Sequence, residues 1–177
     1  MPHSEALAPR TKGLVDAKER LEDAIAAAKG PSPEKLAAHD KLIAEGEIAL
    51  GSEQLLEPAG DSAYDKFRGA LAIDPRSERA KAGMAAIAQA LRLRIDASLQ
   101  AGRATRAEGD MAALETVDPR ANLSDLKRRI ARAYAENGLR SLTAGAIDQA
   151  RSDLADAERL DAGDATVARL RGELAGR

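Results

Sequence analysis

One short sequence pattern ends three successive segments of the chain at nearly constant spacing. It reads ALAIDP at residues 70–75, LETVDP at 114–119 and AERLDA at 157–162. The final residues of these stretches are 44 and 43 positions apart. A fixed period of this length is the signature of a repeat protein, in which each unit is one supersecondary element that packs on its neighbours.

The residues upstream of each end also repeat. Each segment carries a small residue, a larger one four positions later and another apolar residue three positions after that: Ala63, Phe67 and Ala70; Ala107, Met111 and Leu114; Ala150, Leu154 and Ala157. Residues three and four apart share one face of a helix. The turn formers Pro58, Gly102 and Gly145 stand 17 residues before the three ends. Each unit is therefore predicted to be a helix, a turn and a second helix.

The helix pairs have long first members and a covering helix at the C-terminal end. Apolar residues at helical spacing run over 78–100 and 123–142. Ser77 and Asn122 are predicted to cap these helices. Residues 164–175 predict a final helix that covers the last pair. A further amphipathic stripe from Leu14 to Ala28 is either a second cap or a tether.

The pattern resembles the tetratricopeptide repeat, whose second helix carries an A-x3-F spacing followed by proline, here Ala63, Phe67 and Pro75. The period is longer than that family's 34 residues, and the third unit has Ala162 in place of the proline. The resemblance implies a short right-handed superhelical stack. The expected organisation is an N-terminal helix and linker at 1–33 and a repeat domain at 34–177, with units at 34–76, 77–120 and 121–163 and a capping helix at 164–175.

Composition agrees with an all-α fold. Hydrophobic residues make up 44% of the chain and charged residues 32%, but aromatic residues only 2%. The abundant Ala, Leu, Arg and Glu are strong helix formers, whereas strand-favouring residues are scarce. The core is expected to rely on close packing of small side chains.

The sequence contains few side chains suited to catalysis or to binding a metal or cofactor. It has no cysteine and only two histidines, His3 and His39, without the spacing of a zinc site or the partners of a catalytic triad. No phosphate-binding glycine motif is present. We therefore expect no enzyme activity, no cofactor and no metal, and interpret His39 as a surface helix residue.

The charge pattern allows two interpretations. The 27 basic and 29 acidic residues nearly balance, which disfavours nucleic acid as a partner. Arginines nevertheless concentrate at 92–106 and 127–132. They form either a site for acidic segments, carboxy-termini or phosphate groups, or a solvated helix face neutralised by nearby acids, and the second interpretation is favoured.

The leading hypothesis is a scaffold that binds a protein or peptide on its concave face, which the first helices line. The predicted partner-binding residues are Ile43, Glu47, Arg92, Asp96, Leu99, Arg132, Ala135 and Leu139. The pattern of basic residues that holds carboxy-terminal tails in some tetratricopeptide domains is not kept at these positions.

A structural role is the alternative. The loop Pro-Ala-Gly-Asp at 58–61 looks like one in accessory domains of multi-domain bacterial proteins, and the chain would then self-associate or act as a spacer. No window is apolar and long enough to insert in a membrane. We expect a cytoplasmic protein, or an extracytoplasmic domain of a membrane-anchored protein if residues are missing upstream of Met1.

Overall fold

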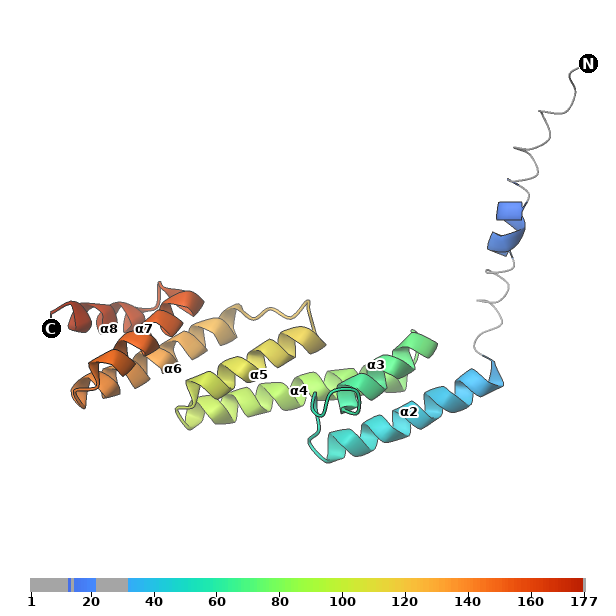
Figure 1. The fold of residues 1–177 in the computed structure, drawn as a ribbon, viewed down its shortest axis with the longest axis horizontal. Helices are drawn as coiled ribbons and strands as arrows, with labels where there is room; N and C mark the ends of the chain where they lie inside the picture. The colour runs from blue at the N-terminus through green and yellow to red at the C-terminus, as the bar shows by residue number, and fades with distance from the viewer. Residues whose placement is uncertain (1–12, 14, 22–31, 177) are drawn as a thin grey trace, which may run out of the picture.

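The computed structural model describes residues 13, 15–21 and 32–176. Residues 15–21 are helical, and the rest of the stripe predicted from Leu14 to Ala28 lies outside the described residues. From residue 33 onward, the chain forms an extended series of antiparallel helices (Figure 1).

The described residues are helical and contain no strand, which confirms the predicted all-α class. The helices are α2 (Pro33–Gly51), α3 (Ala63–Ile73), α4 (Glu78–Gln100), α5 (Ala104–Val117), α6 (Ser124–Thr143), α7 (Ile147–Asp161) and α8 (Ala165–Ala175). The long first helices at 78–100 and 123–142 are thus present, the second as 124–143.

The helices contact one another as three pairs and a final helix. The most extensive contacts are within the pairs α2/α3, α4/α5 and α6/α7. Each predicted unit contains one of these pairs. Between units, α3 packs on α4 and α5 on α6, while α8 packs on both α6 and α7. The first helices also touch in succession, α2 with α4, α4 with α6 and α6 with α8, so they form a continuous row.

Short polar residues and glycines set the helix ends. The side chains of Ser32, Ser62, Ser77 and Asp164 accept a hydrogen bond from a backbone N–H in the first turn of α2, α3, α4 and α8. Asn122 does not occupy the cap position of α6, which is Leu123, but its Oδ1 accepts from the Ser124 N–H at 3.0 Å. Gly102 and Gly145 have positive φ angles, which allow the sharp turns within the second and third pairs.

The repeated apolar positions form the core. Eight of their nine side chains are buried, and Leu154 is the half-buried exception. Phe67 fills the space left by glycines on both neighbouring first helices: a Cβ on Gly46 would lie 3.0 Å from its ring, and one on Gly83 2.4 Å. Close approach of α2 and α4 to the single phenylalanine therefore depends on these glycines.

Candidate functional site

The eight residues predicted to bind a partner do not all reach the surface. Ile43 and Ala135 are completely buried and belong to the core. The prediction that they contact a partner is wrong, because a helix inside a stack buries a wider arc than repeat alignment indicates. Glu47 and Arg132 are exposed, and Arg92, Asp96, Leu99 and Leu139 are partly exposed.

Three of the four charged members of this set pair with the next first helix along the row. Glu47 on α2 binds Arg79 on α4 at 2.8 Å, and Asp96 on α4 binds Arg129 on α6 at 2.7 Å. Arg132 on α6 binds Asp164, the N-cap of α8, at 2.9 Å. Arg92 is 3.9 Å from Asp118 at the end of α5. These pairs cross the row of first helices at every step, so the charges have partners within the chain.

Asp164 is the most constrained member of these pairs. Burial disfavours its charge, but the Arg132 guanidinium and the Thr166 N–H donate to its carboxylate, and together they hold the pKa of Asp164 below its usual value. The interaction therefore fixes the start of α8 against α6.

Two of the predicted residues meet at a hollow between α4 and α6, which we call the first-helix hollow. It has a volume of about 210 Å³ and is lined by Leu99, Arg129, Arg132, Ala133 and Glu136. The prediction included Leu99 and Arg132 but not Arg129, Ala133 or Glu136. Arg129 belongs to the basic stretch 127–132, which was the available signal for it.

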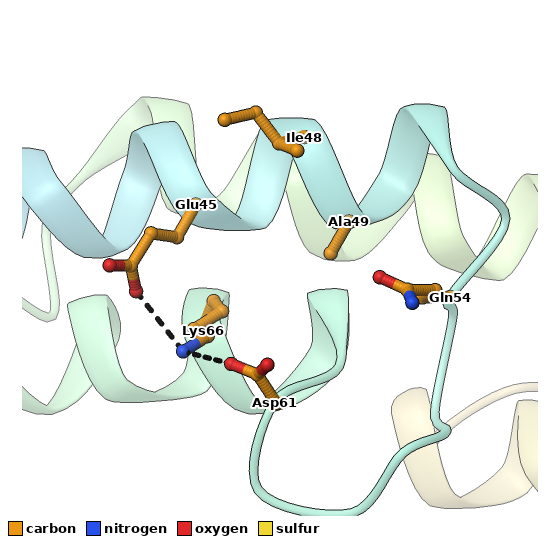
Figure 2. Close-up of a pocket in the computed structure, with 6 residues that line it drawn as sticks. All are labelled: Glu45, Ile48, Ala49, Gln54, Asp61 and Lys66. Carbon is orange, nitrogen blue, oxygen red and sulfur yellow. Dashed lines mark ion pairs between the residues drawn. The ribbon is translucent and has the colours of Figure 1, made fainter.

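A second hollow lies between α2, the loop before α3 and α3 itself (Figure 2). Its volume is about 280 Å³, and its lining residues are Glu45, Ile48, Ala49, Gln54, Asp61 and Lys66. Lys66 Nζ lies 2.5 Å from Asp61 and 3.1 Å from Glu45, and the two carboxylates raise the pKa of Lys66. The amine is held charged, which is the opposite of what a nucleophilic lysine requires.

The second helices are joined by a separate polar network. Glu108 on α5 accepts from Arg159 on α7 at 2.6 Å and from the Tyr134 hydroxyl on α6 at 2.9 Å. The Arg159 bond is the main reason that the pKa of Glu108 is lowered, whereas burial is the main reason that the pKa of Tyr134 is raised to about 12. Tyr134 thus stays protonated and serves as a donor between units.

His39 is not the surface residue that the sequence indicated. It is only 8% exposed, and its Nε2 lies 2.8 Å from the hydroxyl of Ser77, which caps α4. Its Nδ1 lies 3.0 Å from Asp40. The imidazole therefore joins α2 to the start of α4.

Within the described residues, no three acidic or histidine side chains gather as metal ligands. Among the described helices, none has the length and apolar character needed to span a bilayer. No protein-family model matches the chain, and searches of curated proteins and of solved structures found no similar protein.

Proposed function

We propose that this chain is a protein-interaction module that binds a segment of a partner across its row of first helices. The fold proposed with it is a right-handed superhelical stack similar to tetratricopeptide repeats, with α8 as the C-terminal cap. The observation that carries the proposal is the first-helix hollow, where Leu99 and Arg132 meet at positions expected to face a partner.

The chemistry of this hollow suits a mixed polar and apolar segment. Leu99 provides an apolar contact, while Arg129 and Arg132 stand close to Glu136. Because both arginines already bind acids of neighbouring helices, a partner carboxylate would share or displace an existing ion pair. The Arg129–Asp96 pair is exposed and contributes at most about 1 kcal/mol, so its exchange costs little. Arg132 would be shared and not displaced, because its partner Asp164 is buried. We expect modest, salt-sensitive affinity.

A charge swap tests the proposal without removing the ion pair. The double variant Asp96→Arg with Arg129→Glu keeps opposite charges at the α4–α6 contact but inverts them toward a partner. The matched control is Glu158→Arg with Arg171→Glu, which swaps an α7–α8 pair of 2.6 Å whose residues do not line the first-helix hollow.

The readout is capture of partner proteins from extracts of the source cells, followed by affinity measurement with each purified candidate. We expect the swap on the first helices to weaken binding by about tenfold or more, and the control swap to leave it unchanged. If the two double variants bind the partner equally well, the first-helix hollow is not the binding site.

Self-assembly as a structural or spacer domain is the second candidate. It is favoured by large apolar side chains that stand exposed on the first helices: Ile48 is 70% exposed and Leu93 59%. Light scattering over a range of concentrations distinguishes the two candidates. A mass that rises with concentration, and that Ile48→Glu reduces to the monomer value, would favour assembly, and a constant monomer would rule it out.

A further inference from the structure

The turn between α4 and α5 carries a hollow of about 160 Å³ that the proposed function does not use. Its lining residues are Arg94, Ala97 and Ser98 on α4, Arg103 in the turn and Arg106 on α5. We call it the arginine hollow. Three guanidinium groups therefore surround a space on the scale of one small anion.

Two of these arginines lack the acidic partners that neutralise most others. Arg94 binds Asp110 at 2.6 Å, and arginines on the row of first helices form the ion pairs described above. By contrast, neither Arg103 nor Arg106 forms an ion pair with any residue that the structure describes. With Asp110 as the one carboxylate bound to the cluster, three positive charges face one negative charge. The arginine hollow therefore has an excess of two positive charges, which matches a doubly charged anion.

Arg103 and Arg106 also lie at the N-terminal end of α5, where additional positive charge is unfavourable. Arg103 is the N-cap residue of α5 and makes no side-chain capping bond, and the first turn of α5 contains no acid. Cations at a helix N-terminus are disfavoured, because the unpaired N–H groups give that end a partial positive charge. An anion in the arginine hollow would offset both repulsions.

Ser98 supplies an independent observation. It lines the hollow although it is only 5% exposed, and its hydroxyl forms no hydrogen bond with a described residue. Among the described residues, the enclosed side-chain atoms without a partner are Arg94 Nε and Asp110 Oδ2. The Ser98 hydroxyl is therefore open to the hollow and can donate to a ligand there. Its place among three arginines provides a neutral donor in an otherwise cationic site.

The rigid parts of the site are already in place. The bond to Asp110 fixes the Arg94 guanidinium, and Gly102 with φ of 68° turns the chain so that Arg103 comes back toward α4. On the other side of Arg94 lies a different hollow, lined by Glu53, Glu57 and several apolar residues. Only the side toward Arg103 and Arg106 is basic.

From these observations we propose that the arginine hollow binds a phosphate monoester group. Guanidinium groups recognise phosphate with paired N–H donors, and a phosphate monoester is close to a dianion at neutral pH. The group would come from a phosphorylated side chain of a partner or from a small phosphorylated molecule. The proposal does not depend on a partner on the row of first helices.

Titration calorimetry with the full chain at low salt tests this. The probes are inorganic phosphate, the peptide Ala-phosphoserine-Ala, its unphosphorylated form and Ala-Glu-Ala. We expect the phosphopeptide or inorganic phosphate to bind and the other two peptides to bind at least about tenfold more weakly. Binding of the phosphopeptide alone identifies a modified side chain as the source, and binding of inorganic phosphate alone identifies a small molecule.

Variants locate the binding. Arg103→Gln with Arg106→Gln should weaken phosphate binding by about tenfold or more, and Ser98→Ala by about threefold. The control is Arg76→Gln with Arg120→Gln, two exposed arginines that each follow a repeated Asp-Pro. Far-ultraviolet circular dichroism confirms that every variant is folded.

Three results would overturn the proposal. One is the absence of binding by both phosphate probes. Another is equal affinity for the phosphopeptide and Ala-Glu-Ala, because the site would then recognise negative charge and not the phosphate group. The third is an equal loss in the two double variants, which would mean that the attraction comes from the general surface charge.

Discussion

The first and second helix pairs contain the same ion pair with its charges reversed. In the first pair, Glu45 on α2 binds Lys66 on α3. In the second, Arg94 on α4 binds Asp110 on α5. Lys66 and Asp110 directly precede the large core residues Phe67 and Met111, so they occupy equivalent positions in the repeat. The repeat preserves where a charge pair stands but not which helix carries the positive charge.

The two ion pairs also differ in how many of their polar atoms have a partner. Lys66 reaches a second acid, Asp61, in the loop before α3. In the second pair, Asp110 Oδ2 and Arg94 Nε are buried without hydrogen-bond partners. The third pair has only the acid: Asp153 precedes Leu154 and accepts a hydrogen bond from Gln149, and no described basic residue forms an ion pair with it. Apolar packing is thus the shared element of the three units, and electrostatics is what varies.

The largest effect is expected where the packing itself is removed. Phe67→Ala should lower the free energy of unfolding by about 3–5 kcal/mol, because the ring is 1% exposed and fills the space beside two glycines. The equivalent Leu154→Ala should cost less, because Leu154 is only half-buried. Urea unfolding of both variants measures the difference. Equal losses would contradict the view that the first unit depends on its aromatic residue.

The charge reversal provides the second test. Arg94→Glu should destabilise the protein by about 1–3 kcal/mol, since it leaves Asp110 buried beside a like charge. Adding Asp110→Lys would recreate the arrangement of Glu45 and Lys66 and should restore most of the loss. Denaturant unfolding of the single and double variants gives the coupling energy. Failure of the second change to restore stability would show that the units are not electrostatically interchangeable.

The helix starts extend the comparison to the last unit. Ser77 caps α4 as a neutral residue, whereas Asp164 caps α8 as a charged one. Asp164→Ala should cost about 1 kcal/mol at neutral pH through loss of the cap and of the Arg132 bond.

The contribution of Asp164 to stability should also depend on pH. Because the pKa of Asp164 is lower in the folded chain than in the unfolded chain, its stabilisation is present above the unfolded pKa and disappears as the pH falls through the folded pKa. Thermal unfolding from pH 7 to pH 2 should show the Asp164→Ala deficit shrinking under acid. A deficit independent of pH would contradict the assigned cause.

The smallest effect concerns the third unit, where the acid lacks a basic partner. Burial is the main cause of the raised pKa of Asp153. The folded chain therefore holds that proton more tightly than the unfolded chain, and this carboxyl lowers stability as the pH rises through the folded pKa. Asp153→Asn should raise the melting temperature slightly at pH 7 and leave it unchanged at pH 3. A lower melting temperature at pH 7 would mean that the charge is favourable.

Much of the fold was accessible from local patterns. The repeated ends, the small-large-apolar spacing and the turn glycines placed the helices from α3 to α8 close to their observed bounds. Helix periodicity and turn chemistry are properties of neighbouring residues, so a single sequence displays them. The candidate site was less accessible. Alignment placed Ile43 and Ala135 on the inner face, although both are in the core.

The sequence by itself determined that the chain is helical, that its elements recur every 43 or 44 residues and which residues can pack on one helix face. Only the tertiary structure decided which charges meet. Glu47 with Arg79, Arg132 with Asp164 and His39 with Ser77 join residues more than 30 positions apart. The angles and offsets between helices set those contacts, and no local pattern encodes them. The same reason explains why Arg103 and Arg106, in a stretch read as neutralised by its acids, stand without ion pairs among the described residues.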